Sequence, residues 1–180
     1  MVTVAGVDLR GSDRRPSGVA VISGRDLSVE SLYSDEEIVD FLTRHRALVV
    51  AIDSPLSHSP SYRHVDRVMV RLGFRVLPPG WRGMSMLVER GVRLASRLSS
   101  MGVVVLETHP RSALKSSKCR GLGELVSKLG LVLPGRLTRD EEDAVVASAV
   151  SLMYVEGAVV EVEGVDGRIY LLPPVCGGSD

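Results

Sequence analysis

The fold is decided near the N-terminus by the stretch TVAGVDLRGSDRRPSGVAVI, residues 3–22. It holds two apolar runs, Thr3 to Asp8 and Gly18 to Ile22, and the polar residues Arg10 to Ser17 between them predict a turn. The next residues, Leu27 to Tyr33, alternate well enough to predict a third strand. The chain is therefore expected to open as three consecutive antiparallel strands.

Helices and apolar strands alternate along the rest of the chain. The runs Ala47 to Ile52 and Val103 to Leu106 are apolar throughout, as is typical of strands buried on both faces. Helices are predicted at about residues 34–45, 61–72, 84–101 and 138–154, with short helical pieces around 113 and 122–129. Residues 158–162 and 167–171 predict a closing hairpin around Asp166-Gly167. The order of elements predicts an α/β fold, and residues 1–180 are expected to form one domain.

The composition limits the classes of partner. The chain has 180 residues, 22 Lys and Arg against 22 Asp and Glu, and no net charge, so any surface for nucleic acid must be local. No apolar run reaches the roughly 18 residues of a membrane span, and the N-terminus resembles no secretory leader. A soluble cytoplasmic protein without a membrane partner is expected. Lys115, Lys118 and Lys128 are the only lysines, and this arginine bias hints at a thermophilic or high-GC source.

The two cysteines, Cys119 and Cys176, show no metal-binding spacing with each other or with histidine. Two isolated thiols are the preferred interpretation, and a bridge between them stays open. Zinc is disfavoured on the same ground.

Three predicted strands end in an acidic residue, at Asp8, Asp53 and Glu107. In α/β sheets, ligands collect beyond the carboxyl ends of the strands, so these positions are candidates for one shared site. Taken singly, an acidic residue after a strand is more often a turn former or a helix cap.

A predicted helix adds two further carboxylates. In the stretch DEEDAVVASA, Asp140 and Asp143 lie three residues apart and share a helix face, and small residues follow them. Thr138 and Glu141 have the spacing of a capping box, so a solvated first turn is an equally good explanation of this acidity.

Taken together, four or five carboxylates at one sheet edge would repel each other unless a cation neutralised them. Oxygen ligands of this kind suit Mg²⁺ or Mn²⁺. Such ions activate water against a phosphodiester, which predicts hydrolysis with the carboxylates as metal ligands.

Four stretches occur in order along the chain: GVDLRGS, AIDSPL, ETHPRSALK and DEEDAVVASAV. As a set they resemble the predicted-nuclease family catalogued as domain of unknown function 429, of the RNase H-like superfamily. The resemblance implies a mixed five-stranded sheet, with three antiparallel and then two parallel strands, flanked by helices, and the predicted C-terminal hairpin would be additional to it.

The resemblance also implies roles for the acidic residues. It makes Asp8, Asp53 and Asp143 catalytic metal ligands, and the D-x-x-D-A pattern looks like the last helix of RuvC-type resolvases, which adds Asp140. Glu107 has no obligatory ligand role in the superfamily pattern, so it is a catalytic candidate from its position alone.

Several basic and aromatic residues are candidates for substrate binding. Arg63, Arg67 and Arg71 are spaced four apart and would form a basic ridge on one helix face, or a solvated face paired with acids. The candidates from the ETHPRSALK stretch are His109 and Lys115. Trp81 could stack on a base or fill the core.

Three functions compete at this stage. The leading one is a Mg²⁺- or Mn²⁺-dependent nuclease acting on DNA or RNA. The others are a nucleotide-binding phosphotransferase or ATPase of the same superfamily, and a binding module whose site has decayed. A homo-oligomer that pairs through the C-terminal hairpin edge is also open.

Overall fold

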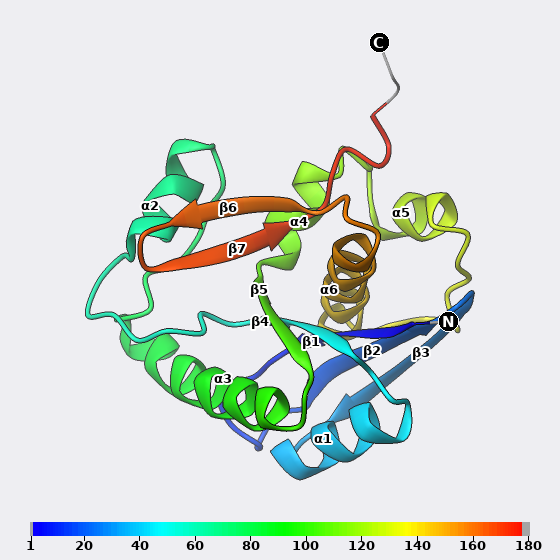
Figure 1. Ribbon diagram of the computed structural model, residues 1–180, viewed down its shortest axis with the longest axis horizontal. Helices are drawn as coiled ribbons and strands as arrows, with labels where there is room; N and C mark the ends of the chain where they lie inside the picture. The colour runs from blue at the N-terminus through cyan, green and yellow to red at the C-terminus, as the bar shows by residue number, and fades with distance from the viewer. Residues whose placement is uncertain (1, 178–180) are drawn as a thin grey trace.

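A seven-stranded mixed sheet forms the centre of the computed structural model, which describes residues 2–177 (Figure 1). In chain order the strands are β1 (Thr3–Asp8), β2 (Ser17–Ser23), β3 (Asp26–Leu32), β4 (Val49–Asp53), β5 (Val104–Thr108), β6 (Val160–Gly164) and β7 (Gly167–Leu171). Their order across the sheet is β3-β2-β1-β4-β5-β7-β6. The first three strands are antiparallel, and β4 and β5 run parallel to β1, as predicted.

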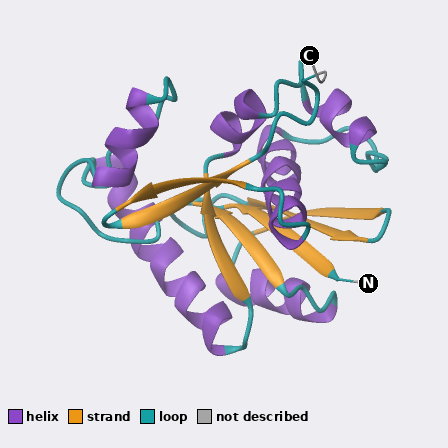
Figure 2. Ribbon diagram, turned by 45° about the horizontal axis from the view of Figure 1, so that its top comes forward, coloured by secondary structure: helices purple, strands orange, loops and turns teal. Residues whose placement is uncertain are grey.

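Helices cover both faces of the sheet (Figure 2). They are α1 (Asp35–Arg44), α2 (His64–Arg71), α3 (Arg82–Ser100), α4 (Pro110–Ser116), α5 (Leu122–Lys128) and α6 (Arg139–Val155). Apolar residues of α1 and α3 pack on one face of the central strands, and those of α6 pack on the other. Within residues 2–177, no helix is long and apolar enough to cross a membrane.

Helix α6 lies unusually close to β1 and β2. A Cβ atom on Gly6 would be 2.1 Å from the backbone nitrogen of Ser148, and one on Gly18 would be 2.1 Å from the carbonyl oxygen of Asp140. The hydroxyl of Ser151 also donates a 2.7 Å hydrogen bond to the carbonyl of Ala5. The small residues therefore bring the start of α6 directly over the sheet, beside the end of β1.

The predicted C-terminal hairpin is part of the sheet, so the five-stranded sheet that the resemblance implied becomes a seven-stranded one. Strand β7 runs parallel to β5 and meets it at a single register pair, Thr108 with Tyr170. The hydroxyl of Thr108 donates a 2.7 Å hydrogen bond to the carbonyl of Tyr170. This junction closes one side of the region where β1, β4 and β5 end.

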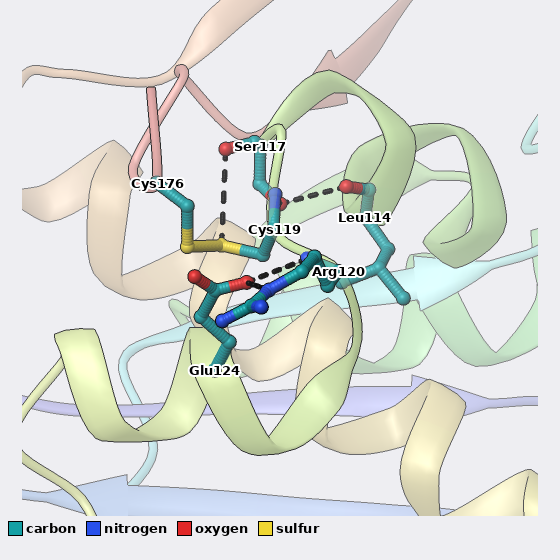
Figure 3. The surroundings of a disulfide bond; sticks show 6 residues. All are labelled: Leu114, Ser117, Cys119, Arg120, Glu124 and Cys176. Carbon is teal, nitrogen blue, oxygen red and sulfur yellow. Dashed lines mark hydrogen bonds and ion pairs between the residues drawn. A yellow bond between two sulfur atoms is a disulfide. The ribbon is translucent and has the colours of Figure 1, made fainter. Parts of the chain in front are cut away.

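The two cysteines form a disulfide, so the preferred interpretation of two isolated thiols was wrong (Figure 3). Cys119 and Cys176 are 57 residues apart in sequence, and their Cα atoms are 4.9 Å apart. The backbone N–H of Cys176 also donates to the carbonyl of Ser117 at 3.0 Å. Spacing along the chain did not reveal this proximity, because the fold brings the segment after β7 back to the connection between α4 and α5.

Candidate active site

A cleft of about 740 Å³ opens at the carboxyl ends of β1, β4 and β5. Its lining combines acidic and basic side chains. The acidic members are Asp8, Asp53, Asp66, Glu107, Asp140 and Asp143, and the basic members are Arg10, Arg63, Arg75, His109, Arg111, Lys115 and Arg139. All five predicted carboxylates therefore border one cavity, although they do not all belong to one cluster.

Asp8 and Asp53 are neighbours because of the strand register. Strands β1 and β4 are parallel with Val7 opposite Ile52, so the residues that follow end adjacent strands side by side. The two carboxyl groups lie close enough for the charge of Asp8 to raise the pKa of Asp53.

Asp143 approaches the pair from α6. The helix begins with the capping box predicted from the sequence. The backbone N–H of Glu141 donates to the hydroxyl of Thr138, and the backbone N–H of Thr138 donates to the carboxylate of Glu141. Asp143 follows the capping residue Thr138 by five residues, and its negative charge raises the pKa of both Asp8 and Asp53. We refer to Asp8, Asp53 and Asp143 as the carboxylate triad.

The triad is electrostatically strained when no cation is bound. Burial, reinforced by the charges of Asp143 and Asp140, raises the pKa of Asp8 to about 7. Burial also raises the pKa of Asp53 well above its usual range, and the charge of Asp8 adds to this effect. The pKa of Asp143 is raised by burial as well, against the opposing charges of Arg111 and Arg139. A bound cation would relieve this repulsion.

The donor set of the triad fits a hard cation, because it offers carboxylate oxygens alone. Within residues 2–177, no three His, Cys, Asp or Glu side chains already lie in positions to hold one ion together. Metal binding by the triad therefore stays a prediction from the sequence and the chemistry of the donors.

Asp140 borders the cleft but is already paired. Both of its oxygens accept hydrogen bonds from the guanidinium of Arg10, one of them from Nε at 2.9 Å. Its charge contributes to the raised pKa of Asp8, so it lies near the triad. Its predicted role as a metal ligand competes with this ion pair.

Glu107 does not join the triad, which corrects the prediction from strand ends. In the β4–β5 register it lies opposite Ile52, whereas Asp53 lies opposite Thr108. Successive side chains of a strand point to opposite faces, so Glu107 and Asp53 do not share a face. The carboxylate of Glu107 instead accepts a 2.9 Å hydrogen bond from Arg63 Nη1 and another, also 2.9 Å, from the backbone N–H of Leu56.

The predicted basic ridge is also wrong at its first member. Arg63 precedes α2 and is buried, because its guanidinium bridges Asp66 and Glu107. The Nη2–Oδ1 distance to Asp66 is 2.7 Å. Arg67 is exposed on α2 and does not line the cleft. The spacing of four placed Arg63 on the helix face of Arg67 and Arg71, but Arg63 lies before the first turn, where two buried acids bind it.

His109 and Lys115 both line the cleft, as predicted. His109 caps α4, and its Nδ1 lies 2.7 Å from the hydroxyl of Ser112. Burial, with a smaller contribution from Arg111, lowers the pKa of His109 to about 4, so the ring is neutral near pH 7. Lys115 donates to the carbonyl of Gly73 at 2.9 Å and so joins α4 to the segment that follows α2.

Arg111 is a cleft residue that the sequence interpretation missed. It is exposed in the first turn of α4, and its charge opposes the rise in the pKa of both Asp143 and Asp53. A signal was present, because Arg111 follows the end of β5 by three residues within the ETHPRSALK stretch. Arg10 and Arg139, which also line the cleft, were missed because nothing in their spacing distinguishes them from surface arginines.

Comparisons with known proteins bear on the fold. No protein-family model and no curated protein sequence matches the chain. Among solved structures it is similar to T. thermophilus RuvC in complex with a Holliday junction substrate, with a TM-score of 0.57 and 14% identity. The match covers 87% of this chain and 96% of that one. At this identity the likeness shows the fold alone, and membership of the family that the sequence motifs resemble stays a prediction. The chain therefore has the mixed α/β, RNase H-like fold that it shares with RuvC.

Proposed function

We propose that the protein is a divalent-metal-dependent nuclease that hydrolyses phosphodiester bonds of DNA or RNA. The observation that carries the proposal is the convergence of Asp8, Asp53 and Asp143, with raised pKa values, in a cleft that arginines also line. Carboxylates whose mutual repulsion is left uncompensated favour a cationic ligand.

The triad residues would hold the metal, and Mg²⁺ and Mn²⁺ match their oxygen donors. A bound divalent ion supplies an activated water and stabilises the charge of the leaving oxygen. Strands β1 and β4 and helix α6 bring the three side chains to the same cleft, and small shifts of the carboxyl groups would complete the ligand set when an ion binds.

The basic lining residues give the cleft its affinity for phosphate. Arg111 is exposed and lies beside Asp53 and Asp143, where it can donate hydrogen bonds to a phosphate next to the triad. His109 is neutral near pH 7, so it can accept a proton but adds no positive charge. The solved complex of the structural neighbour with a Holliday junction supports nucleic acid as the substrate class.

The direct test measures cleavage of end-labelled single-stranded DNA, duplex DNA, junction DNA and RNA with Mn²⁺ or Mg²⁺. Asp8→Asn is expected to lower the rate roughly a thousandfold, since a metal ligand supplies several kcal/mol to the transition state. Asp13→Asn, an exposed acid in the β1–β2 connection, is the matched control and should cleave like the wild type. Equal cleavage by Asp8→Asn and the wild type would sink the proposal.

A second measurement separates a nuclease from a binding module with a decayed site. Mn²⁺ should raise the melting temperature of the wild type, because a ligand of the native state stabilises it. Asp53→Asn and Asp143→Asn should abolish the rise. Metal binding through the triad without cleavage of any substrate would favour the binding module.

A further inference from the structure

The second half of α2, the connection to α3 and the first turns of α3 carry an unusual charge distribution. We call residues 67–88 the arginine segment, because they include Arg67, Arg71, Arg75 and Arg82 and no acidic residue. All four arginines are exposed. The chain as a whole has no net charge, so this segment is the kind of local positive surface that the balanced composition left open.

The same segment exposes large apolar side chains. The exposed fractions are 58% for Leu72, 52% for Leu77, 58% for Trp81 and 59% for Met86. Trp81 is the single tryptophan of the chain. It caps the start of α3, and its backbone N–H donates to the carbonyl of Pro78 at 3.1 Å, so the backbone is held while the indole remains open to solvent. The alternative prediction that Trp81 fills the core was therefore wrong.

The arginine segment also forms one wall of the cleft. Its cleft-lining residues are Gly73, Phe74, Arg75, Val76, Leu77, Met84 and Leu87. Lys115 on α4 anchors this wall through the carbonyl of Gly73, and its ammonium lies 5.7 Å from the centre of the Phe74 ring. Figure 1 shows the segment passing from α2 to α3 at one side of the molecule.

We propose that the arginine segment binds a nucleic-acid strand whose bases are unpaired, with a base stacked on Trp81 and phosphates held by Arg75 and Arg82. This proposal rests on the proposed function and names its substrate class. Positive charge interleaved with exposed aromatic and apolar groups suits a single strand, which presents both phosphates and base faces. A duplex hides its base faces within the stack, so it would leave the apolar part of this surface unused.

Trp81 is its own reporter, because it is the single tryptophan. The test titrates the protein with a single-stranded oligonucleotide, and separately with the duplex of the same sequence, in EDTA so that no strand is cut. DNA and RNA strands are both used. The single strand should quench the tryptophan fluorescence and bind at least about tenfold more tightly than the duplex.

Variants locate the binding surface. Trp81→Ala should weaken single-strand binding, measured by the anisotropy of a labelled strand, by about tenfold, and Trp81→Phe should restore most of it. Arg75→Ala and Arg82→Ala should each lower the salt dependence of binding by about 0.7 in log–log slope. Arg25→Ala, an exposed arginine in the turn at the opposite end of the sheet, is the matched control and should bind like the wild type.

The outcomes keep the two proposals apart. Equal affinity for strand and duplex, or unchanged binding by Trp81→Ala, overturns the inference even if the enzyme cleaves nucleic acid. Quenching and selective strand binding in EDTA support it, and if no metal then gives cleavage, the proposed nuclease activity fails while the binding surface stands.

Discussion

Two groups of acidic side chains border the same cleft, and they differ in how their charge is neutralised. Glu107 and Asp66 share Arg63, and the three side chains are between 3% and 8% exposed. The carboxylate triad has no such buried partner among the described residues, and its charge is opposed by Arg10, Arg111 and Arg139, which are partly or fully exposed. The difference teaches that a buried acid at a strand end indicates a ligand site only when the fold leaves its charge uncompensated.

The paired group has a clear structural task. Arg63 joins the start of α2 to the end of β5, and it also donates to the hydroxyl of Ser57 at 3.1 Å. Glu107 accepts from the backbone of Leu56 as well. The group thus holds the segment that follows Asp53, and it supports the triad without contributing to it.

The largest effect on stability is expected from breaking the paired group. Arg63→Ala leaves two buried carboxylates without their cation, so the free energy of unfolding should fall by about 3–5 kcal/mol. Arg67→Ala, which removes an exposed arginine of α2, should change it by less than about 0.5 kcal/mol. Urea unfolding measures both, and a small loss for Arg63→Ala would show that the two groups do not differ as described.

The disulfide is a crosslink whose cysteines do not line the cleft, so it can be compared with the two acidic groups that do. Reduction, or the Cys119→Ser and Cys176→Ser double variant, should lower the free energy of unfolding by about 2–4 kcal/mol, because it releases a loop closed over 57 residues. Cleavage of nucleic acid at a temperature well below the melting point should be unchanged. Lost activity in the folded, reduced protein would mean that the bridge also shapes the cleft.

Removing a charge from the triad should raise the free energy of unfolding, whereas breaking the paired group should lower it. The pKa of Asp8 is about 7 in the folded protein, whereas in the unfolded chain it has its ordinary value of 3.8. Stability from this group is therefore full below the unfolded pKa and is lost as the pH rises through about 7.

Asp8→Asn removes this dependence. In EDTA, the variant should gain stability relative to the wild type between about pH 5 and about pH 8, by on the order of 2 kcal/mol. Thermal unfolding across this range gives the difference between the two proteins. A difference that stays constant with pH would contradict the raised pKa of Asp8.

The smallest effect is expected for Asp140. Because Arg10 already binds both of its oxygens, Asp140→Asn should lower cleavage by less than about tenfold, far less than Asp8→Asn. Parallel cleavage assays of the two variants at the same metal concentration compare them directly. A loss as large as that of Asp8→Asn would place Asp140 with the triad as a fourth ligand.

Much of the fold could be predicted because the signals are local. The alternation in Leu27 to Tyr33, the apolar run ending at Asp53 and the capping box at Thr138 each reflect interactions within a few residues. The register of β7 with β5 could not be predicted, because a single pair, Thr108 with Tyr170, joins segments that lie 62 residues apart.

The sequence by itself determined the order and type of the elements and placed Asp8 and Asp53 at the ends of predicted strands, because hydrophobic periodicity and strand ends are written in neighbouring residues. Only the tertiary structure decided that Glu107 turns away to Arg63 and that Cys119 meets Cys176. Which face a terminal side chain takes, and which distant group meets it, depends on register and packing, and neither is encoded within a short window of sequence.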